Sequence, residues 1–481
     1  MCGASRDDRR GRVLAGARGG FAMKSFEGRG RGIAGAGFVL SALTVSALSL
    51  PTGCAIPESQ VGEAYTTIQL TNPTAMQRYH EPVEIPLSEV RARYRNFNEK
   101  DFSAHLLPSN WYPDRGDGLL ATDPAPMIPA QAIDKDFDGT ADTLLVIADF
   151  EPSEKRYLAL ASPVFSKLAK KSGPRTSGGM WARETTRREA GALKAEGAYT
   201  KVQNAVLDPS HQKGDGLYQG DGVLFETDRS AWRVLFDSRL CLDVVGKRDR
   251  EIRFDPKQKA FTADFLDLNA APWGGSLLGD VTGFGAGAFG YQEGGTIVPL
   301  AGVDSVQYRL IKDGPAATEI EFVMFGARLG AEAFDLRWRM THYAGGRIIR
   351  HDVNVSRFGH GLAFAMNSGG ERKESPTGQQ SWMRSTSFGA GNATGAAGGE
   401  LGLAIIASGR TATGFVKSPA DVMGVAFDSV SRNLTFYTVA AWNQETGGLR
   451  DAQDFQRYVE ELVQRLDQPI RSFNLNKTIG S

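Results

Sequence analysis

The chain has 481 residues and carries 55 basic and 55 acidic side chains, so its formal net charge is zero. A neutral chain gives no electrostatic reason to expect nucleic acid or an anionic membrane surface as a partner. Its length suffices for two or three domains, and 57 glycines between short apolar segments favour an all-β protein. Its three cysteines are too few for a disulfide framework or a cysteine metal site, and Cys241 is expected to be a buried structural thiol.

Residues 1–54 are typical of an export signal. A basic segment around Lys24 precedes the apolar run 38–50, which is too short for an ordinary membrane-spanning helix. The following Gly53-Cys54 resembles a bacterial lipoprotein cleavage site, although Pro51 stands where such sites usually have an aliphatic residue. We therefore expect an exported protein, either periplasmic or a lipoprotein of the outer membrane or cell surface. Lipidation of Cys54 would be its only attachment to a membrane.

Strand-like segments begin at Tyr65 and recur as far as residue 162. Residues 144–148 and 157–161 are apolar and β-branched enough for two strands, and a Glu-Pro-Ser-Glu turn separates them. The sequence therefore predicts that residues 64–162 form a small β-sandwich of the immunoglobulin-like type.

An acidic motif lies inside this region, with aspartates at alternate positions around Gly139. Carboxylates at this spacing can converge on one hard cation. The position of the bidentate glutamate of an EF-hand is occupied by Leu145, and a strand follows instead of a helix. The motif predicts a calcium loop of the kind found in β-proteins, with the ligands Asp134, Asp136, Asp138 and Asp142. The alternative is a solvated acidic turn in which Gly139 only supplies a positive φ.

Residues 163–210 are basic, polar and rich in alanine, and we expect one or two short helices that link two β domains. From residue 211 strand-like segments resume, with strict alternation in TEIEFVMF and FDLRWRMTHY. So many strands between residues 211 and 475 predict a large double β-sandwich, or supersandwich, because that fold hides most strand edges. The region closes with a C-terminal helix at 451–466, whose apolar residues share one face and whose N-terminus Asp451 can cap.

The most site-like stretch is 220–248, where an acidic cluster is followed at once by arginines. A Gly/Asp-rich polar loop comes directly before it. The candidate catalytic residues are His211 and Tyr218 in the loop, followed by Glu226, Asp228, Arg229 and Arg233. The alternative for the charged residues is an ion-pair cluster that fixes the sheet. Trp273 lies in another Gly-rich loop, where it can stack on a sugar ring or pack in a core.

Four segments together resemble a bacterial family known as domain of unknown function 4861. They are the stretch 220–248, the loop from Trp273 through GFGAGAFG, KDGPAATEIEF, and MTHYAGGRIIRHDVNVS. The resemblance covers residues 64–470 and implies a secreted protein associated with polysaccharide degradation, with a large domain similar to galactose mutarotase. Where many members have an acidic residue after Trp-Gly, this chain has Gly275-Ser276 after Trp273-Gly274; Asp280 is the nearest substitute for substrate binding.

Together these features predict a carbohydrate-active protein that acts on an acidic, uronate-containing polysaccharide or oligosaccharide. In a lyase, Arg229 or Arg233 would neutralise the uronate carboxylate, and His211 or Tyr218 would transfer protons. In a glycoside hydrolase, Glu226 and Asp228 would form the acid/base pair. The alternatives are a non-catalytic glycan-binding lipoprotein and a mutarotase-like sugar isomerase.

Overall fold

The structure is a computed structural model, and it describes most of the chain. The described residues are 65–95, 97–111, 126–161, 175–189, 192–254, 272–279, 281–300, 302–330, 332–357, 361–375, 382–416 and 421–473. All of them belong to one compact unit, Ile56–Ser481. The predicted export signal, Cys54 and Asp280 lie outside these residues. None of the described helices is long and apolar enough to cross a membrane.

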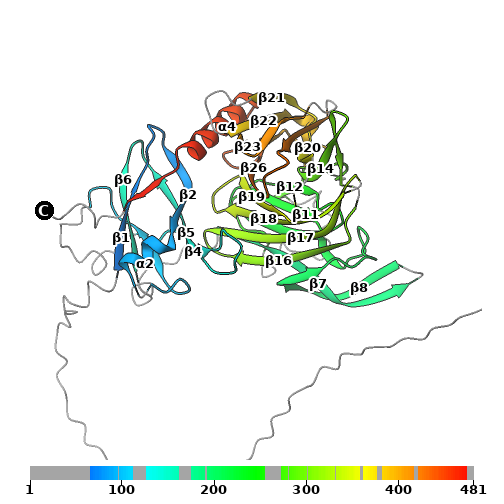
Figure 1. Ribbon diagram of the computed structural model, residues 1–481, viewed down its shortest axis with the longest axis horizontal. Helices are drawn as coiled ribbons and strands as arrows, with labels where there is room; N and C mark the ends of the chain where they lie inside the picture. Colours follow the sequence, from blue (N-terminus) through cyan, green and yellow to red (C-terminus); the bar gives the residue numbers. More distant parts are fainter. Residues whose placement is uncertain are drawn as a thin grey trace, which may run out of the picture. The chain divides into compact units, whose positions relative to one another are not determined.

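The all-β architecture with a C-terminal helix is confirmed: the described strands form five sheets (Figure 1). Two of these sheets make a small sandwich. One sheet contains, in spatial order, β27 (Arg471–Phe473), β1 (Tyr65–Thr71), β6 (Lys155–Ala161) and β3 (Ser103–Leu106). The other contains β2 (Arg78–Pro86), β5 (Thr143–Phe150) and β4 (Ala130–Ile133), and the short helix α2 (Leu87–Arg93) follows β2.

The small sandwich follows from the alternation of its strands. In β1, Ile68 and Leu70 point inward and are almost fully buried, and they share one core with Leu158 of the neighbouring strand β6 and Leu144 of β5 in the facing sheet. One strand was not expected in this domain. β27 comes from the C-terminal end of the chain and pairs with β1, so the predicted boundaries of 64–162 and 211–475 are incomplete. A three-residue strand carries too little pattern to be recognised without its partner.

The predicted helical linker is wrong for the described part of residues 163–210. β7 (Thr176–Glu189) and β8 (Ala192–Val202) form an antiparallel hairpin, and β9 (Asn204–Val206) follows. β7 also pairs with β10, and Met180 and Trp181 on it are completely or almost completely buried. The polar, alanine-rich composition of this region suggested helices, but pairing with the large sheet decides the conformation because it buries these two side chains.

Three sheets form the large sandwich. The first contains β13 (Gly274–Ser276), β12 (Leu242–Lys247), β11 (Ala231–Leu235), β10 (Tyr218–Thr227), β7 and β8. The second contains β15 (Thr296–Pro299), β14 (Ala288–Glu293), β20 (Leu362–Asn367), β25 (Val422–Phe427) and β24 (Ala412–Phe415). The third contains β21 (Glu371–Ser375), β22 (Trp382–Gly389), β23 (Leu401–Ser408), β26 (Asn433–Trp442), β19 (Ile348–Val355), β18 (Glu332–Tyr343), β17 (Ala317–Leu329), β16 (Ser305–Asp313) and β9.

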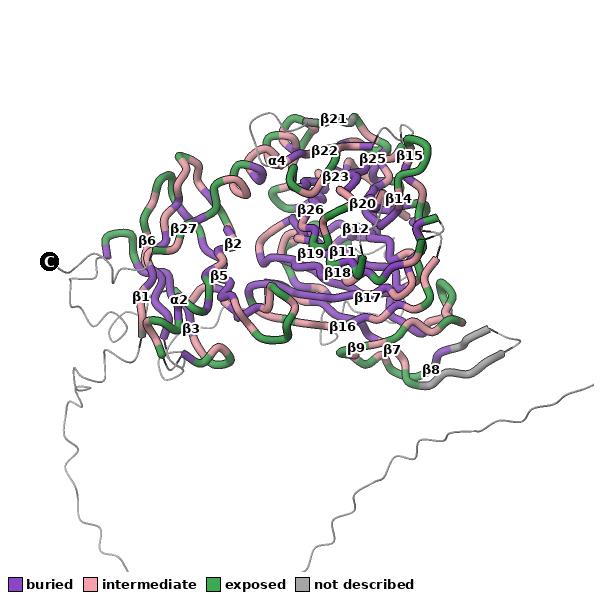
Figure 2. The backbone as a smooth tube through the Cα atoms, in the orientation of Figure 1, coloured by how far each residue is buried: buried purple, intermediate pink, exposed green. Residues whose placement is uncertain are grey.

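The main core lies between the nine-stranded sheet and the other two, where the backbone in Figure 2 is almost continuously buried. Aromatic rings meet across this interface. Phe289 of β14 lies edge-on to Trp338 of β18 at 5.0 Å, and Phe236 after β11 lies 6.4 Å from Tyr308 of β16. Cys241 is free and buried, as predicted, and burial raises the pKa of its thiol to about 12.

The opposite face of the nine-stranded sheet is also covered. The helix α4 (Ala452–Asp467) packs Phe455 and Val459 against β22 and β23, and the side chain of Asp451 accepts hydrogen bonds from two backbone N–H groups of its first turn. Beside it, residues of β4 and β5 in the small sandwich belong to the same apolar cluster. The helix and the small sandwich thus meet the nine-stranded sheet on one face.

Candidate functional site

A cavity of about 770 Å³ lies where the small sandwich, the nine-stranded sheet and α4 meet. Its described lining combines five arginines, three glutamates, one histidine and several aromatic side chains. These polar and aromatic residues are Arg229, Arg250, Arg347, Arg350, Arg465, Glu81, Glu84, Glu461, His80, Tyr79, Tyr343, Tyr437, Tyr458 and Trp382. They come from segments as distant in sequence as β2 and the end of α4.

Arg347 lines the cavity from the turn between β18 and β19, and Arg350 lines it from the start of β19. Gly345 has a φ of 77°, which permits the tight reversal. The Nε of Arg347 donates to Glu445 Oε1 at 2.6 Å. Arg350 forms ion pairs with Glu84 at 2.9 Å and with Asp352 at 2.8 Å. These two guanidinium groups are therefore held rigidly by carboxylates of their own.

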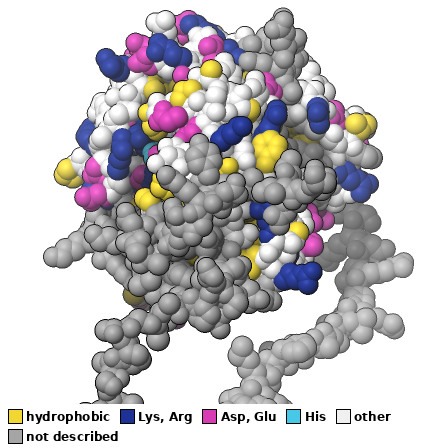
Figure 3. All heavy atoms as spheres, turned by 90° about the vertical axis from the view of Figure 1, so that its left-hand side faces the viewer, with side chains coloured by type: hydrophobic (Ala, Val, Ile, Leu, Met, Phe, Trp, Pro, Cys, Tyr) yellow, Lys and Arg dark blue, Asp and Glu magenta, His cyan; other side chains and the backbone are white. Residues whose placement is uncertain are grey.

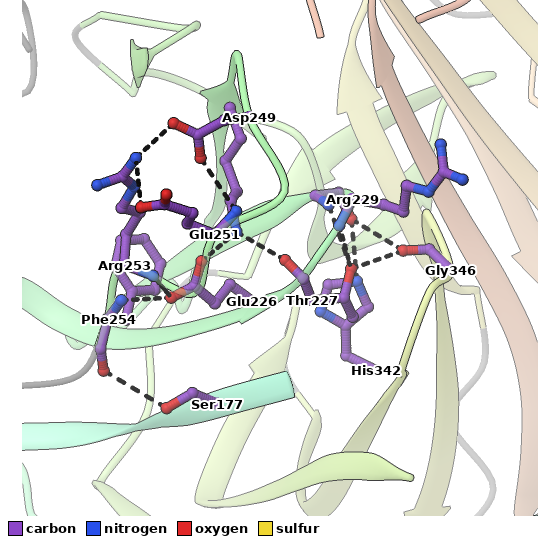
Figure 4. A network of polar contacts seen from close by, with 12 residues as sticks. Ser177, Glu226, Thr227, Arg229, Asp249, Glu251, Arg253, Phe254, His342 and Gly346 are labelled. Atoms are coloured by element: carbon purple, nitrogen blue, oxygen red, sulfur yellow. Dashed lines mark hydrogen bonds and ion pairs between the residues drawn. The ribbon is translucent and has the colours of Figure 1, made fainter. Parts of the chain in front are cut away.

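Arg229 differs from them because no described residue forms an ion pair with it. It lies in the turn between β10 and β11, and its side chain points away from the polar network around Glu226 in Figure 4. Its Nε is buried and has no hydrogen-bond partner among the described residues. Burial lowers the pKa of Arg229, and the positive charges of Arg347 and Arg250 lower it further, although Asp228 and Glu445 oppose this effect. Arg229 thus combines an unpartnered donor with two neighbouring like charges, an arrangement that favours an anion beside it.

Two of the three cavity glutamates, Glu81 and Glu84, pair with the cavity arginines Arg465 and Arg350. Burial raises the pKa of Glu81, against the opposing charges of Arg465 and Arg78. Burial also acts on Glu84, but Arg350 and Lys135 outweigh it and hold the pKa of Glu84 below its usual value. Both glutamates are therefore committed to other cations. Basic and acidic side chains are mixed over the face shown in Figure 3.

Aromatic side chains form another part of the wall. Trp382 of β22 is half-buried and meets the ring of Tyr437 at 5.3 Å in an edge-to-face arrangement. Burial raises the pKa of Tyr437 to about 12, so its hydroxyl keeps its proton at neutral pH. Tyr458 of α4 lies 5.6 Å from the guanidinium of Arg347. Rings with an apolar face and a polar edge suit a ligand that is partly apolar and partly hydroxylated.

Glu226 and Asp228, the predicted acid/base pair, form ion pairs with different cations. The side chains of Glu226 and Lys247 form an ion pair in which both are fully buried. The other oxygen of Glu226 accepts hydrogen bonds from the backbone N–H groups of Arg253 and Phe254 (Figure 4). Burial raises the pKa of Glu226, although the charge of Lys247 opposes that effect. Asp228 lies beyond the strand, and its Oδ2 accepts from Arg175 at 2.9 Å, whereas its Oδ1 has no hydrogen-bond partner in the described structure.

Arg233 is excluded from substrate contact for the same reason. Its guanidinium donates to Asp243 at 2.6 Å and to the carbonyl of Gly220 at 3.1 Å, and its side chain is only 6% exposed. The structural alternative for this stretch, an ion-pair cluster that fixes the sheet, therefore describes Glu226, Asp228 and Arg233. Among the charged candidates of 220–248, Arg229 is the one that lines the cavity.

His211 and Tyr218 come together, but they do so away from Arg229. Their rings lie 4.8 Å apart, and His211 Nδ1 lies 2.8 Å from Asp215 Oδ2. Burial raises the pKa of Tyr218 to about 12, which makes it a poor base at neutral pH. The two ends of β10 pair with Ala182 and Thr176 of β7, so they lie roughly 20 Å apart. The predicted pairing of these residues with Arg229 in one active site is wrong.

The remaining predicted residues have separate places. Trp273 is half-buried beside Phe254, at 6.5 Å between ring centroids, and does not line the cavity. In the acidic loop, carboxylate oxygens of three aspartates lie within 4.8 Å of one another. These are Asp134, Asp136 and Asp138. The fourth predicted ligand, Asp142, has one buried oxygen without a hydrogen-bond partner in the described structure. Calcium binding at this loop stays a prediction.

Sequence reasoning missed most of the cavity. Trp382, Tyr437 and Tyr458 were not among the predicted site residues, because nothing near them in sequence indicates a site. A local signal exists only for Arg347 and Arg350, since the segment MTHYAGGRIIRHDVNVS places both arginines after a Gly-Gly turn. That spacing brings two cations to one end of a hairpin.

Comparisons with known proteins identify the family. The family described as "Domain of unknown function (DUF4861)" matches residues 70–471. A search of curated proteins found no match. Among solved structures, a protein in the glycosyl hydrolase family 38 from Enterococcus faecalis aligns with a TM-score of 0.41 and 8% identity, covering 87% of this chain and 48% of that chain.

An alpha-mannosidase from Enterococcus faecalis V583 aligns with a TM-score of 0.38 and 9% identity, covering 86% of this chain and 47% of its own. The chain therefore spans about half the length of these solved structures. The match of the family to residues 70–471 confirms the resemblance seen in the sequence, and the chain belongs to the DUF4861 family.

Proposed function

We propose that this protein is an exported, carbohydrate-active protein that binds an acidic, uronate-bearing saccharide in the cavity beside α4. The observation that carries the proposal is Arg229. Its donors face a cavity that contains two further cations nearby, Arg250 and Arg347, and its Nε has no described partner. A carboxylate placed there would satisfy the donors and relieve the repulsion between the arginines.

The aromatic wall supports a sugar in preference to a small inorganic anion. A saccharide ring offers an apolar face to Trp382 and hydroxyl groups to the polar rim of the cavity. A volume of about 770 Å³ is in the range of binding pockets for molecules much larger than a single ion. The combination of positive charge and aromatic rings therefore favours an acidic oligosaccharide.

Direct binding tests this proposal. Isothermal titration with oligogalacturonate is compared with the same oligosaccharide after its carboxylates have been reduced to alcohols. We expect binding of the acidic form only. Arg229→Ala should weaken it about 10- to 100-fold, because hydrogen bonds to a charged group contribute about 1.5–3 kcal/mol. Arg229→Lys should retain part of the affinity, since it keeps the charge and loses the planar fork of donors.

The matched control is Arg328→Ala. Arg328 lies on β17, is nearly half exposed, and pairs with Asp304 outside the cavity. The Arg328→Ala variant should bind the acidic oligosaccharide as tightly as the wild type does. Equal affinity for the acidic and the reduced oligosaccharide, or an unchanged affinity in Arg229→Ala, would contradict the proposal.

Whether the bound saccharide is also cleaved is a separate question that the cavity makes testable. A lyase needs a base near the uronate carboxylate, and His80 is the histidine of the described lining, with its Nδ1 3.4 Å from Asp149 Oδ1. Ultraviolet absorbance from an unsaturated uronate product, lost in His80→Gln with binding intact, would establish elimination. New reducing ends without that absorbance would indicate hydrolysis, and binding with neither product supports the glycan-binding alternative.

Export and lipidation of Cys54 belong to the same proposal. Incorporation of a labelled fatty acid into the wild-type protein, and its loss in Cys54→Ala, would support a lipoprotein. A secreted protein that carries no label would instead support simple export.

A further inference from the structure

A second polar cluster lies at the end of β10 that is remote from the cavity. His211, Asp215 and Asp221 bring an imidazole nitrogen and two carboxylate oxygens within 4.8 Å of one another. None of the three lines the saccharide cavity. The cluster therefore needs an explanation that is independent of the function proposed above.

The loop in front of β10 fixes two of these side chains. The backbone N–H of His211 donates to the carbonyl of Asp208 at 3.0 Å, which closes a turn. The carboxylate of Asp215 accepts from the N–H of Gln212 and from the N–H of Leu217, each at 2.9 Å. His211 and Asp215 are therefore oriented by the loop itself before any ligand arrives.

Asp221 provides the observation that points to a ligand. Its relative exposure is only 3%. Its Oδ1 accepts from the N–H of Gly214 at 2.9 Å, whereas its Oδ2 is buried and has no hydrogen-bond partner in the described structure. The neighbouring cation Arg233 is occupied by Asp243 and the carbonyl of Gly220. A buried carboxylate oxygen without a partner is costly unless a cation compensates it.

We propose that His211, Asp215 and Asp221 bind one divalent transition-metal ion, of the class of Zn²⁺ or Mn²⁺. A mixed set of one imidazole and two carboxylates suits these ions, whereas Ca²⁺ and Mg²⁺ take oxygen ligands. Donors about 2.1 Å from one ion lie roughly 3–3.5 Å apart, and the 2.8 Å between His211 Nδ1 and Asp215 Oδ2 needs only a small adjustment.

The surroundings fit such a site. The ring of Tyr218 lies edge-on to His211 at 4.8 Å, and the ring of Phe236 lies 5.0 Å from that of Tyr218. One side of the cluster is therefore apolar. An apolar shell limits the access of water and strengthens the attraction between the ion and the carboxylates. The ion would join the loop that carries His211 to the start of β10, which carries Asp221, and its role would be to stabilise the large sandwich at that corner.

The test uses the purified protein after treatment with EDTA and dialysis. Zinc and manganese are titrated separately by calorimetry, bound metal is counted by mass spectrometry, and thermal unfolding is followed with and without each ion. We expect one equivalent of zinc or manganese and a higher Tm in its presence. Asp221→Asn and His211→Gln should each weaken binding by at least about 100-fold, because loss of a direct ligand exceeds the effect of outer-shell changes.

His80→Gln is the matched control, since it removes a more exposed histidine that also lies beside a carboxylate. This variant should still bind one equivalent of zinc or manganese. Absence of zinc and manganese binding in the wild-type protein would overturn the proposal. So would retention of full affinity in both Asp221→Asn and His211→Gln, with folding verified by circular dichroism. Stabilisation by calcium alone, lost in Asp136→Asn, would also overturn it and would assign the cation to the acidic loop instead.

Discussion

Replacing Glu226 by glutamine should destabilise the large sandwich strongly, although the side chain keeps nearly the same shape. The substitution removes the negative charge that faces the ammonium group of Lys247, and both side chains are 0% exposed. Breaking a buried ion pair by removing one partner costs about 3–5 kcal/mol, because the remaining charge is left without compensation. The amide oxygen can still accept from the N–H groups of Arg253 and Phe254, so we expect the lower half of that range.

The assay is urea unfolding followed by circular dichroism and fluorescence. The double variant Glu226→Gln with Lys247→Met should recover most of the loss, since neither charge then remains buried. Asp304→Asn, at the exposed pair with Arg328, is the control and should change stability by less than about 1 kcal/mol. A stable Glu226→Gln variant that had lost turnover of a saccharide would refute this reasoning and restore a catalytic role for Glu226.

Three further predictions concern other parts of the chain. Burial raises the pKa of Glu319 from 4.5 to about 7. The stability that this raised pKa contributes is fully present below pH 4.5 and is lost as the pH rises through 7. Between pH 4 and pH 8, the free energy of unfolding of the wild type should therefore fall by about 3 kcal/mol relative to that of Glu319→Gln. Parallel pH profiles of the two proteins would contradict this prediction. Calcium should raise the Tm of wild type and not of Asp136→Asn, and a Tm indifferent to chelator would exclude the calcium loop. Phe455→Ala should cost about 3–5 kcal/mol in urea unfolding and weaken saccharide binding, because α4 forms part of the cavity; full stability would refute the packing role.

The elements that the sequence predicted well are those whose pattern is local. The alternation of TEIEFVMF identifies β17, where Ile320, Phe322 and Met324 are fully buried on the core side. The helical spacing after Asp451 identifies α4, and its capping side chain is where the sequence places it. In both cases the period of the apolar residues matches the geometry of one element, so no knowledge of the rest of the chain is needed.

The elements that escaped prediction depend on partners far away in the sequence. β7 is a strand because β10 and β8 pair with it, and its own composition does not show that. The cavity is assembled from residues between Tyr79 and Ile470, and no local motif records that convergence. Glu226 and Arg229 are three residues apart and looked alike as candidates. One is sealed by Lys247 and the other faces a cavity, and only the tertiary arrangement separates them.

The pairing of β27 with β1 affects the order in which the chain can fold. β1 is synthesised long before β27, yet they are neighbours in one sheet through the register Gln69↔Phe473 to Thr71↔Arg471. Until β27 has emerged, one edge of β1 is open, and an open edge invites pairing with other chains. The N-terminal sandwich is therefore complete only after the large sandwich and α4 have been produced, and a chain cut short before residue 471 would keep an exposed edge permanently.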